Sequence, residues 1–502
     1  MPAGRPQLVW FKRDLRTFDH RPLVEAARRG PCLCLYAYEP DILAGEDNDA
    51  CHLEFVNQSL AELREDLRSL GGELIIRTGR LPEVLVELRR EVPFEAIWAH
   101  EETGNALTFA RDRRVARWAR ENGVGFFETY QHGVVRRLKS RDGWSRQWEQ
   151  RMNEPLTPKP ERLAPIAGLA AGELRPPESL GLKPSTKQAA QRGGAALGRQ
   201  ELDSFLGSRG QNYRSDMSSP VTGEDGCSRL SPYLAYGCLS LRHVHQATVR
   251  RATQVKASKA RGEPVEPGWA ESLQAFAGRL RWHCHFMQKL EDEPRIEHGN
   301  VNRAFDGLRE DDWTEDYSAA WTRGETGYPM VDACMRALHQ TGWINFRMRA
   351  MLVSFASYHL WLHWPRPAAY LARQFVDYEP GIHYSQFQMQ AGTTGINSVR
   401  IYSPLKQVAD QDPHGVFIRK FLPELADVPD EHLAEPHKLP PVLQQDAGCV
   451  IGRDYPAPLV PHGSAYNEAR RRMDLWRKRL GVRREARRVM QKHGSRRKSR
   501  WR

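Results

Sequence analysis

Two arginines lie in an otherwise strongly apolar stretch of the chain. Arg347 and Arg349 belong to Trp343-Ile-Asn-Phe-Arg-Met-Arg-Ala-Met-Leu-Val-Ser-Phe-Ala-Ser-Tyr358. A buried guanidinium is stable only when it is paired, because removing an isolated charge from water costs much free energy. We therefore expect an anionic partner, which is either the acidic pair in Asp377-Tyr-Glu379 or a bound phosphate. The alternative is that both arginines face solvent along one seam of a helix.

A second group of polar residues precedes a predicted helix. It reads Gly226-Cys-Ser-Arg-Leu-Ser-Pro-Tyr-Leu234. Small and hydroxylic residues at the start of a helix leave backbone N–H groups and hydroxyls free to bind phosphate. An ordinary helix cap has the same composition.

The cysteines and histidines do not indicate a metal. The eight cysteines include no C-x-x-C pair, and we interpret them as reduced thiols of the core. His283-Cys284-His285 are consecutive, so their side chains diverge around a helix and cannot easily share one ion.

The positive charge is concentrated at the C-terminus. Residues 470–502 hold 16 Lys and Arg against Asp474 and Glu485, a net +14 in a chain whose total is +12. Such a segment can strengthen nonspecific nucleic-acid binding in a salt-dependent way. The alternative is a solvated amphipathic helix with a frayed end.

Short apolar runs alternate with amphipathic stretches in the first 130 residues. The strand-like runs are Gln7–Phe11, Cys32–Tyr38, Glu73–Arg77, Glu95–Ala99 and Val124–Glu128, and helical patterns include Leu53–Leu70 and Ala106–Glu121. This order is typical of a doubly wound, parallel α/β domain. Neither G-x-G-x-x-G nor a Walker loop follows a strand, so this domain is not expected to hold a dinucleotide or triphosphate.

The remaining sequence predicts a larger all-α domain. Ala, Gly and Pro are frequent from Leu163 to Arg199, and helical spacing then dominates. Helices are expected over Trp269–Leu290, Tyr328–Gln340 and Trp343–Trp364. The predicted division is 1–130 for the α/β domain, 131–199 for a linker, 200–480 for the helical domain and 481–502 for a basic tail. No apolar run approaches the roughly 18 residues of a spanning helix, and Leu8-Val-Trp-Phe11 is too short for a signal peptide, so a cytoplasmic monomer without membrane contact is expected.

Taken together, these segments resemble the photolyase/cryptochrome family in their order, spacing and residue types. Leu8-Val-Trp-Phe-Lys-Arg-Asp-Leu-Arg16 is similar to the start of that family's antenna domain, and Cys227-Ser-Arg-Leu-Ser-Pro-Tyr-Leu234 resembles its flavin phosphate loop. Further matches are Thr326-Gly-Tyr-Pro-Met-Val-Asp-Ala-Cys-Met-Arg-Ala-Leu338, Thr341-Gly-Trp-Ile-Asn345, Arg400-Ile-Tyr-Ser-Pro404 and Phe417-Ile-Arg-Lys-Phe-Leu-Pro-Glu-Leu425. The resemblance covers the chain to about residue 480.

The resemblance implies FAD held inside the helical domain. The residues that would hold it are Tyr213, Cys227, Ser228, Arg229, Leu230, Ser231, Arg347, Arg349, Asp377, Glu379 and His383. Cys227 replaces a Thr and gives up a strong hydroxyl donor. Arg349 would pair with Asp377 beside the isoalloxazine, and Glu379 would lie near the ribose and adenine. Photoexcited FADH− would then donate an electron to a flipped-out pyrimidine dimer and split it.

This chain departs from the family at the flavin. His383 falls where most photolyases place an Asn against flavin N5, and an imidazole there could change charge near neutral pH. The alternative is a gap that moves Tyr384 or Ser385 to that place.

The usual tryptophan chain for electron transfer is also interrupted. Trp364 matches its middle member, but Phe387 replaces the member next to the flavin. Electrons could instead pass through Trp361, Tyr358 or Tyr384, although aromatic residues in an apolar helix are more often core.

The lesion pocket that the resemblance implies is altered as well. Trp282 matches one wall, whereas Arg279 replaces a Glu, Phe346 an Asn and Met389 the second Trp wall. The histidine pair of six-four photolyases is missing too. An alternative role for Arg279 is contact with a DNA phosphate, which suits a cation better than a carboxylate.

The resemblance leads to one main functional prediction and two alternatives. The main one is a light-driven, FAD-dependent photolyase that acts on UV-damaged DNA, with cyclobutane dimers as the favoured lesion. The alternatives are a cryptochrome-like photoreceptor without repair and a dark FAD oxidoreductase, the latter disfavoured because no nicotinamide fingerprint accompanies the flavin site. A folate or deazaflavin antenna is less clearly indicated, because Asn105 matches a folate-binding Asn but lacks the acidic residue that follows it.

Overall fold

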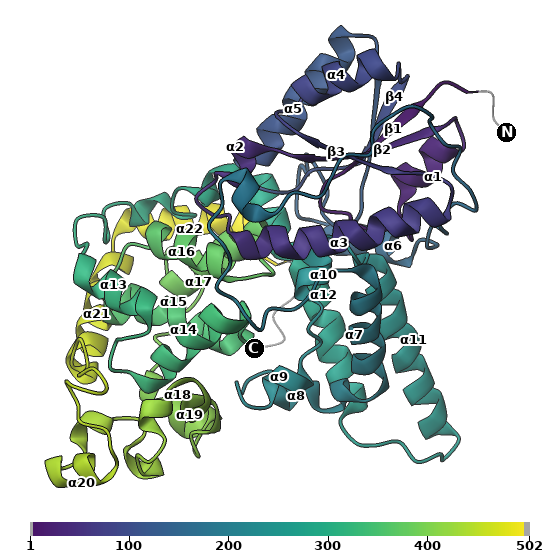
Figure 1. Cartoon of the computed structure of the whole chain (residues 1–502). Helices are drawn as coiled ribbons and strands as arrows, with labels where there is room; N and C mark the ends of the chain where they lie inside the picture. The colour runs from purple at the N-terminus through teal and green to yellow at the C-terminus, as the bar shows by residue number, and fades with distance from the viewer. Residues whose placement is uncertain (1–3, 496–502) are drawn as a thin grey trace.

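The N-terminal part of the chain forms a five-stranded, fully parallel sheet (Figure 1). We describe residues 4–495 of a computed structural model. The strands are β1 (Gln7–Phe11), β2 (Cys32–Tyr38), β3 (Leu74–Thr78), β4 (Ala96–His100) and β5 (Gly125–Thr129), in the order β3-β2-β1-β4-β5. The helices of this part are α1 (Arg21–Ala27), α2 (Pro40–Leu43), α3 (Ala50–Ser69), α4 (Glu83–Glu91), α5 (Ala106–Glu121) and α6 (Trp144–Asn153). The predicted doubly wound α/β architecture is confirmed.

The central strand explains why the sheet is covered on both faces. All five residues of β1 are buried, and successive side chains point to opposite faces. Leu8 and Trp10 join the cluster made with α4 and α5, whereas Val9 and Phe11 join the cluster made with α1 and α3. β1 and β2 have the predicted bounds, and the other three strands begin and end one residue later than predicted.

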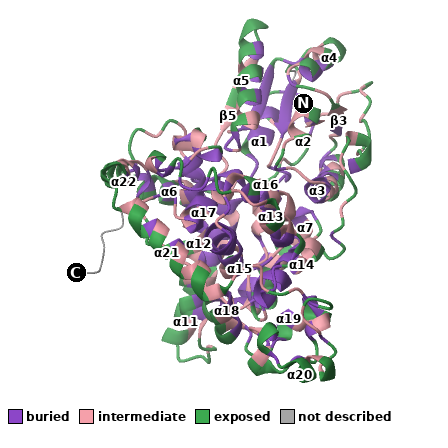
Figure 2. Cartoon of the chain, turned by 90° about the vertical axis from the view of Figure 1, so that its left-hand side faces the viewer, coloured by how far each residue is buried: buried purple, intermediate pink, exposed green. Residues whose placement is uncertain are grey.

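The larger, second part of the chain is helical. Its helices are α7 (Ala195–Gly207), α8 (Tyr213–Asp216), α9 (Gly223–Gly226), α10 (Ser231–Ala235), α11 (Leu241–Ala260), α12 (Trp269–Asp292), α13 (Glu315–Arg323), α14 (Pro329–Thr341), α15 (Phe346–Ser354), α16 (Pro365–Gln374), α17 (Pro380–Ala391), α18 (Pro404–Gln411), α19 (Val416–Phe421), α20 (Pro441–Asp446), α21 (His462–Arg477) and α22 (Leu480–His493). Figure 2 shows that buried residues concentrate on α12, α15 and α17, at the centre of this part. Within residues 4–495, none of the helices has the length and apolar composition needed to cross a bilayer.

The predicted helix Trp343–Trp364 is shorter in the structure. Helix α15 begins at Phe346, changes to a π-helical turn over Phe355–His359, and ends before Trp361, whose φ is +52°. A non-glycine residue rarely adopts this left-handed conformation, so the chain turns sharply here. Trp361 and Trp364 therefore lie outside the helix that holds Arg347 and Arg349.

The two parts share one hydrophobic core. The Phe55 ring of α3 lies 5.4 Å from the Tyr233 ring and 5.2 Å from the Tyr236 ring, which belong to the helical part. Helix α6, within the predicted linker, contributes Trp144 and Trp148 to the same cluster. The two parts are thus joined by packing as well as by the chain.

The described part of the basic C-terminal segment packs against the helical domain through α22. Val482 and Val489 are buried, and His493 Nε2 lies 2.7 Å from a carboxylate oxygen of Glu293, at the end of α12. Residues 481–493 therefore continue the helical part instead of forming a separate tail. Residues 496–502 of the predicted tail lie outside the described residues.

Candidate functional site

A cavity of about 500 Å³ opens between α12, α15, α17 and the loop before α10. Thirteen of the residues expected at a cofactor or substrate site line it: Tyr213, Cys227, Ser228, Arg229, Ser231, Arg279, Trp282, Phe346, Arg347, Arg349, Asp377, Glu379 and His383. These residues come from five separate segments of the sequence, and the fold brings them to one place. We call this space the helical cavity.

Arg349 and Asp377 form the ion pair that the sequence predicts. Two nitrogens of the Arg349 guanidinium donate to the two carboxylate oxygens at 2.9 and 2.8 Å, and its Nε donates to the carbonyl of Ile344 at 2.9 Å. Burial opposes ionisation of Asp377, but the charge and hydrogen bonds of Arg349 outweigh it and hold the pKa of the carboxyl below its usual value. A bidentate pair therefore fixes one wall of the helical cavity.

Arg347 has no such partner, which corrects the expectation of an acidic partner from Asp377 or Glu379. Its guanidinium contacts Ser218 Oγ at 3.3 Å, and its Nε is buried without a hydrogen-bond partner within residues 4–495. Residues two apart on a helix point in different directions, so Arg347 faces away from the pair that Arg349 makes. An unpaired nitrogen beside a cavity is suited to bind an anion.

The loop from Cys227 to Ser231 provides further donors. Arg229 adopts a left-handed conformation with φ of +56°, and the backbone N–H groups of Ser228 and Arg229 donate to no acceptor in the described part of the chain. Burial raises the pKa of the Cys227 thiol to about 12, so the thiol is neutral. The Leu230 side chain is 1% exposed and packs into the core, so its predicted part in holding a phosphate falls to its backbone and stays a prediction.

Glu379 connects the helical cavity to the α/β domain. A carboxylate oxygen lies 3.5 Å from a guanidinium nitrogen of Arg13, which follows β1, and its other oxygen is buried without a partner within residues 4–495. Burial raises the pKa of Glu379, and Arg13 opposes this shift. Arg13 also donates to the carbonyls of Ala235 (2.9 Å) and Tyr378 (2.5 Å). A residue of the α/β domain thus supports the cavity wall.

His383 lies in the helical cavity, whereas Tyr384 and Ser385, the alternatives for its place, do not line it. Its Nε2 lies 2.9 Å from the carbonyl of Ala368, which places the proton on Nε2 and leaves Nδ1 as an acceptor. Burial lowers the pKa of His383 to about 4. The prediction that this ring changes charge near neutral pH is therefore wrong.

The mouth of the helical cavity is aromatic. Trp282 and Phe346 are 44% and 42% exposed, and the Arg279 guanidinium lies 5.2 Å and 5.7 Å from their ring centres. Exposed apolar side chains that gather at the mouth of a cavity are typical of a ligand-binding site. Two flat rings and a cation could stack against a planar ligand.

Met389 does not line this cavity, which corrects its assignment as a second wall. The lining residues of α17 are Ile382, His383, Gln386, Phe387 and Gln390. Positions three, four and seven after His383 share its helix face, whereas position six lies on another face. The sequence analysis missed Gln386 and Gln390, although this spacing could have identified them.

The residues expected to carry electrons are divided between two places. The Trp364 ring is buried and lies 6.4 Å from Phe387, which lines the helical cavity, and 6.4 Å from Tyr384. Trp361 instead lies under Arg309 and Arg472, at 4.4 and 5.0 Å from their guanidinium carbons. Trp364 and Tyr384 are thus each separated from the cavity by one ring. Trp361 belongs to a different cluster.

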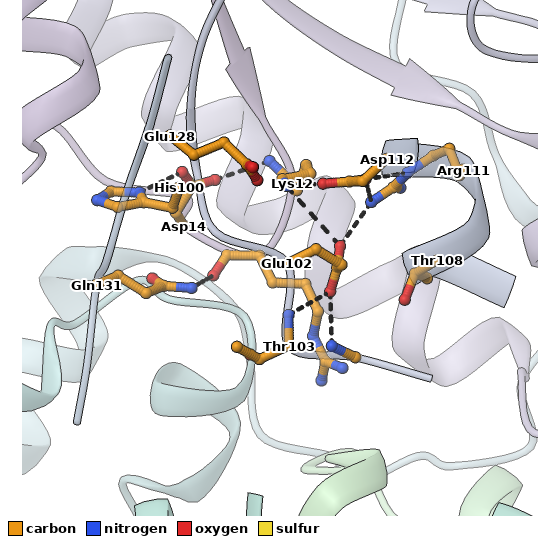
Figure 3. A network of polar contacts seen from close by, with 12 residues as sticks. Lys12, Asp14, His100, Glu102, Thr103, Thr108, Arg111, Asp112, Glu128 and Gln131 are labelled. Atoms are coloured by element: carbon orange, nitrogen blue, oxygen red, sulfur yellow. Dashed lines mark hydrogen bonds and ion pairs between the residues drawn. The ribbon is translucent and has the colours of Figure 1, made fainter. Parts of the chain in front are cut away.

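A second cavity, of about 140 Å³, lies at the carboxyl ends of the strands; we call it the sheet-edge cavity. It contains Asn105, whose amide donates to Asp47 Oδ2 at 3.1 Å, and Tyr378 lines both cavities. Figure 3 shows the charged network along its wall. In this network Arg111 contacts Glu39, Glu102 and Asp112 at 2.8, 2.6 and 2.8 Å, and Lys12 contacts Asp112 at 2.6 Å.

Comparison with known proteins places the chain among photolyases and cryptochromes. Residues 7–158 match the DNA photolyase family, and residues 276–475 match the FAD binding domain of DNA photolyase. Cryptochrome DASH of Gloeobacter violaceus is 30% identical over 92% of this chain and 95% of its own length. Deoxyribodipyrimidine photo-lyase of Halobacterium salinarum is 29% identical, over 92% of this chain and 98% of its own.

Solved structures agree with this placement. A bacterial class III photolyase from Agrobacterium tumefaciens superimposes with a TM-score of 0.83 at 25% identity, covering 95% of this chain and 99% of its own. An archaeal photolyase from Sulfolobus tokodaii, solved with two FAD molecules, shares the fold with a TM-score of 0.75 at 24% identity, covering 94% and 100% of the two chains. The sequence matches, the two-part fold and the helical cavity together show that this chain belongs to the photolyase/cryptochrome family and contains its FAD-binding domain.

Proposed function

We propose that this protein is an FAD-dependent DNA photolyase, driven by blue or near-UV light, that binds flipped-out pyrimidine dimers. The observation that carries the proposal is the helical cavity, in which an exposed aromatic mouth leads to an interior with an uncompensated guanidinium. A flipped-out dimer presents the ring faces of its two linked bases, for which Trp282 and Phe346 offer apolar aromatic surfaces. Arg279, between these rings, is suited to a phosphate of the damaged strand.

The residues of the helical cavity fit FAD. The free amides of Ser228 and Arg229 and the unpaired Nε of Arg347 suit a pyrophosphate, and Arg349, fixed by Asp377, would hold the isoalloxazine. When bound and reduced, the flavin supplies the electron that splits a dimer. Glu379 would accept hydrogen bonds from a ribose or adenine through its unpaired oxygen. Cation, carboxylate and amide groups thus occur in the arrangement that a dinucleotide needs.

Cyclobutane dimers are the proposed lesion. Their cleavage needs an electron but no general acid, and His383 stays neutral because its pKa is about 4. The second histidine that lines the cavity, His283, is also buried, and burial lowers its pKa to about 4. The site therefore suits electron transfer without proton transfer to the substrate.

The test is anaerobic and uses chemically reduced protein. DNA with one defined cyclobutane dimer, or one six-four product, is illuminated, and the restored bases are quantified against dark controls. Chemical reduction bypasses photoreduction, so the result reports on the helical cavity alone. We expect light-dependent restoration of the cyclobutane dimer, and failure with both lesions in a protein that retains FAD would exclude repair.

A cryptochrome-like photoreceptor is the second candidate. It is favoured by Phe346 and Arg279, which lack the amide and carboxylate through which photolyases of this family hold a dimer. In that case light would change the flavin redox state without altering DNA. Tight FAD binding and photoreduction combined with no restoration of either lesion would support it.

The sheet-edge cavity is the proposed place for an antenna chromophore of folate or deazaflavin type. It is lined by aromatic rings, including Trp10, Tyr36 and Tyr236, and by the amide of Asn105. Release of a second chromophore on denaturing the purified protein, and its loss on Tyr36→Ala, would support this assignment. We also propose that the protein acts as a cytoplasmic monomer, which sedimentation and cell fractionation can test.

A further inference from the structure

One tyrosine forms a wall shared by the two cavities. Tyr378 lines the helical cavity beside His383 and the sheet-edge cavity beside Asp47. We propose that Tyr378, with Asp47 as its proton acceptor, donates an electron to photoexcited oxidised flavin in the helical cavity. This inference rests on the proposed function only in requiring that FAD binds there.

The geometry joins an oxidisable ring to a base. The Tyr378 phenol donates to Asp47 Oδ2 at 2.6 Å, and both side chains are buried, at 6% and 7% exposure. On its other side, the Tyr378 ring centre lies 5.3 Å from the His383 ring. Burial and the Asp47 charge raise the pKa of Tyr378 well above its usual value, so the phenol holds its proton at neutral pH. Oxidation must therefore move a proton as well as an electron, and Asp47 is in contact to receive it.

The other aromatic residues that could donate an electron lack an adjacent base or a direct place in the cavity. The other Trp and Tyr side chains lining the helical cavity are Tyr213, Trp282, Trp343 and Tyr402. Within residues 4–495, Tyr378 is the one member of this set with a hydrogen bond to a carboxylate. Trp282 is 44% exposed at the mouth, where bound DNA would cover it, and Trp364 is separated from the cavity by Phe387. The best-placed pair of donor and base is thus Tyr378 and Asp47.

The step balances in atoms and electrons. One electron leaves the Tyr378 ring for the photoexcited oxidised flavin, the phenol O–H bond breaks, and its proton forms a bond to Asp47 Oδ2. The products on the protein are a neutral tyrosyl radical and a protonated carboxyl group. An external thiol then returns one electron to the radical, and the proton returns from Asp47, so the flavin keeps its electron.

The test compares three variants with the wild type. Tyr378→Phe removes the phenol, and Asp47→Asn keeps the shape of the acceptor but removes its basicity. Tyr455→Phe is the matched control, because Tyr455 is also buried and donates to a carboxylate, that of Asp332, away from both cavities. FAD occupancy per chain is measured first, from absorbance. Transient absorption then follows the tyrosyl radical and flavin photoreduction, in H2O and in D2O.

The expected results separate the two roles. Wild type and Tyr455→Phe form the tyrosyl radical, and photoreduction is slower in D2O. Tyr378→Phe lacks the radical, and Asp47→Asn slows photoreduction at least about tenfold, since a positioned base contributes about 10²–10⁴-fold to a proton transfer.

Two different outcomes would overturn the inference, and they are distinguishable. FAD bound at wild-type occupancy with an unchanged radical signal in Tyr378→Phe would assign the donor elsewhere and leave the proposed function intact. A wild-type protein that fails to take up FAD at all would reject the proposed function, and this inference with it.

Discussion

The two cavities differ in how their charges are balanced. At the sheet edge, Arg111 and Lys12 are enclosed by Glu39, Glu102 and Asp112, so each cation has a carboxylate within 3 Å. In the helical cavity Arg349 is paired, but Arg347 and Arg279 make no ion pair within the described residues. A self-neutralised wall has no electrostatic need of a charged ligand, whereas an unpaired guanidinium favours an anion. This difference supports the proposal that the phosphate-bearing ligand binds in the helical cavity.

The largest effect is expected from Asp377→Ala. Breaking a buried ion pair from one side costs about 3–5 kcal/mol, because the other charge is left uncompensated. FAD affinity should then fall at least about 100-fold, measured as FAD retained per chain after gel filtration. Asp377→Asn, which can still accept a hydrogen bond, should lose less. Wild-type occupancy in Asp377→Ala would refute the role of this pair.

Arg111→Met should affect the folded state instead of the flavin. It leaves Glu39 and Glu102 buried together without their shared cation, and we expect the free energy of unfolding to fall by about 3 kcal/mol. Chemical denaturation measures this loss, and FAD content per folded chain should stay at the wild-type value. Loss of FAD at unchanged stability would contradict the division between the two cavities.

A third prediction concerns His383 in the helical cavity and the pH dependence of the free energy of unfolding. The pKa of His383 is about 4 in the folded protein, below the usual value of about 6.5, so between these pH values the unfolded chain binds the additional proton. The His383 contribution to stability is therefore full above about pH 6.5 and is lost as pH falls towards 4. His383→Gln should flatten the pH dependence of unfolding in this window by up to about 3 kcal/mol. A slope equal to that of wild type would mean that the ring is not buried as described.

The smallest effect concerns the outer face of α22. Arg483, Arg484 and Arg487 are exposed, whereas Val482 and Val489 are buried. Deleting residues 470–502 would remove core contacts, so the triple substitution of these arginines to Gln is the better test of DNA binding. If all three contact phosphates, the slope of log K against log salt should fall by up to about 2.7. An unchanged slope would show that these three arginines do not contact DNA phosphates.

Sequence patterns predicted the architecture well because it depends on periodicity. Gln7–Phe11 and Ala106–Glu121 were located to the residue, since an apolar strand and an amphipathic helix are each determined by local side chains. The basic C-terminal segment was harder to interpret. The packing of this segment depends on contact between His493 and Glu293, which is 200 residues away in the sequence. A local sequence pattern does not indicate such a contact.

The ion pair of the candidate site was predicted, because a buried charge requires a partner. The residues of α17 that line the cavity were missed, because the orientation of the helix determines which of its side chains face the cavity. The cost of a buried charge indicated an anionic partner for the arginines, and the family resemblance implied the pairing of Arg349 with Asp377. Met389 was chosen by counting along the chain, but the face of α17 selects Gln386 and Gln390. The neutral state of His383 could not be predicted, because its cause is burial by residues from other elements.

Arg13 has a consequence for how this protein could be divided. Although it follows the first strand, its guanidinium holds the backbone of Ala235 and Tyr378 and the carboxylate of Glu379. A fragment that starts after the sheet would lack this clamp, and an N-terminal domain grafted from a relative would have to supply an arginine at the same point. The wall of the helical cavity is therefore built from both domains, and an exchange of the N-terminal domain preserves it only where the arginine after β1 is kept.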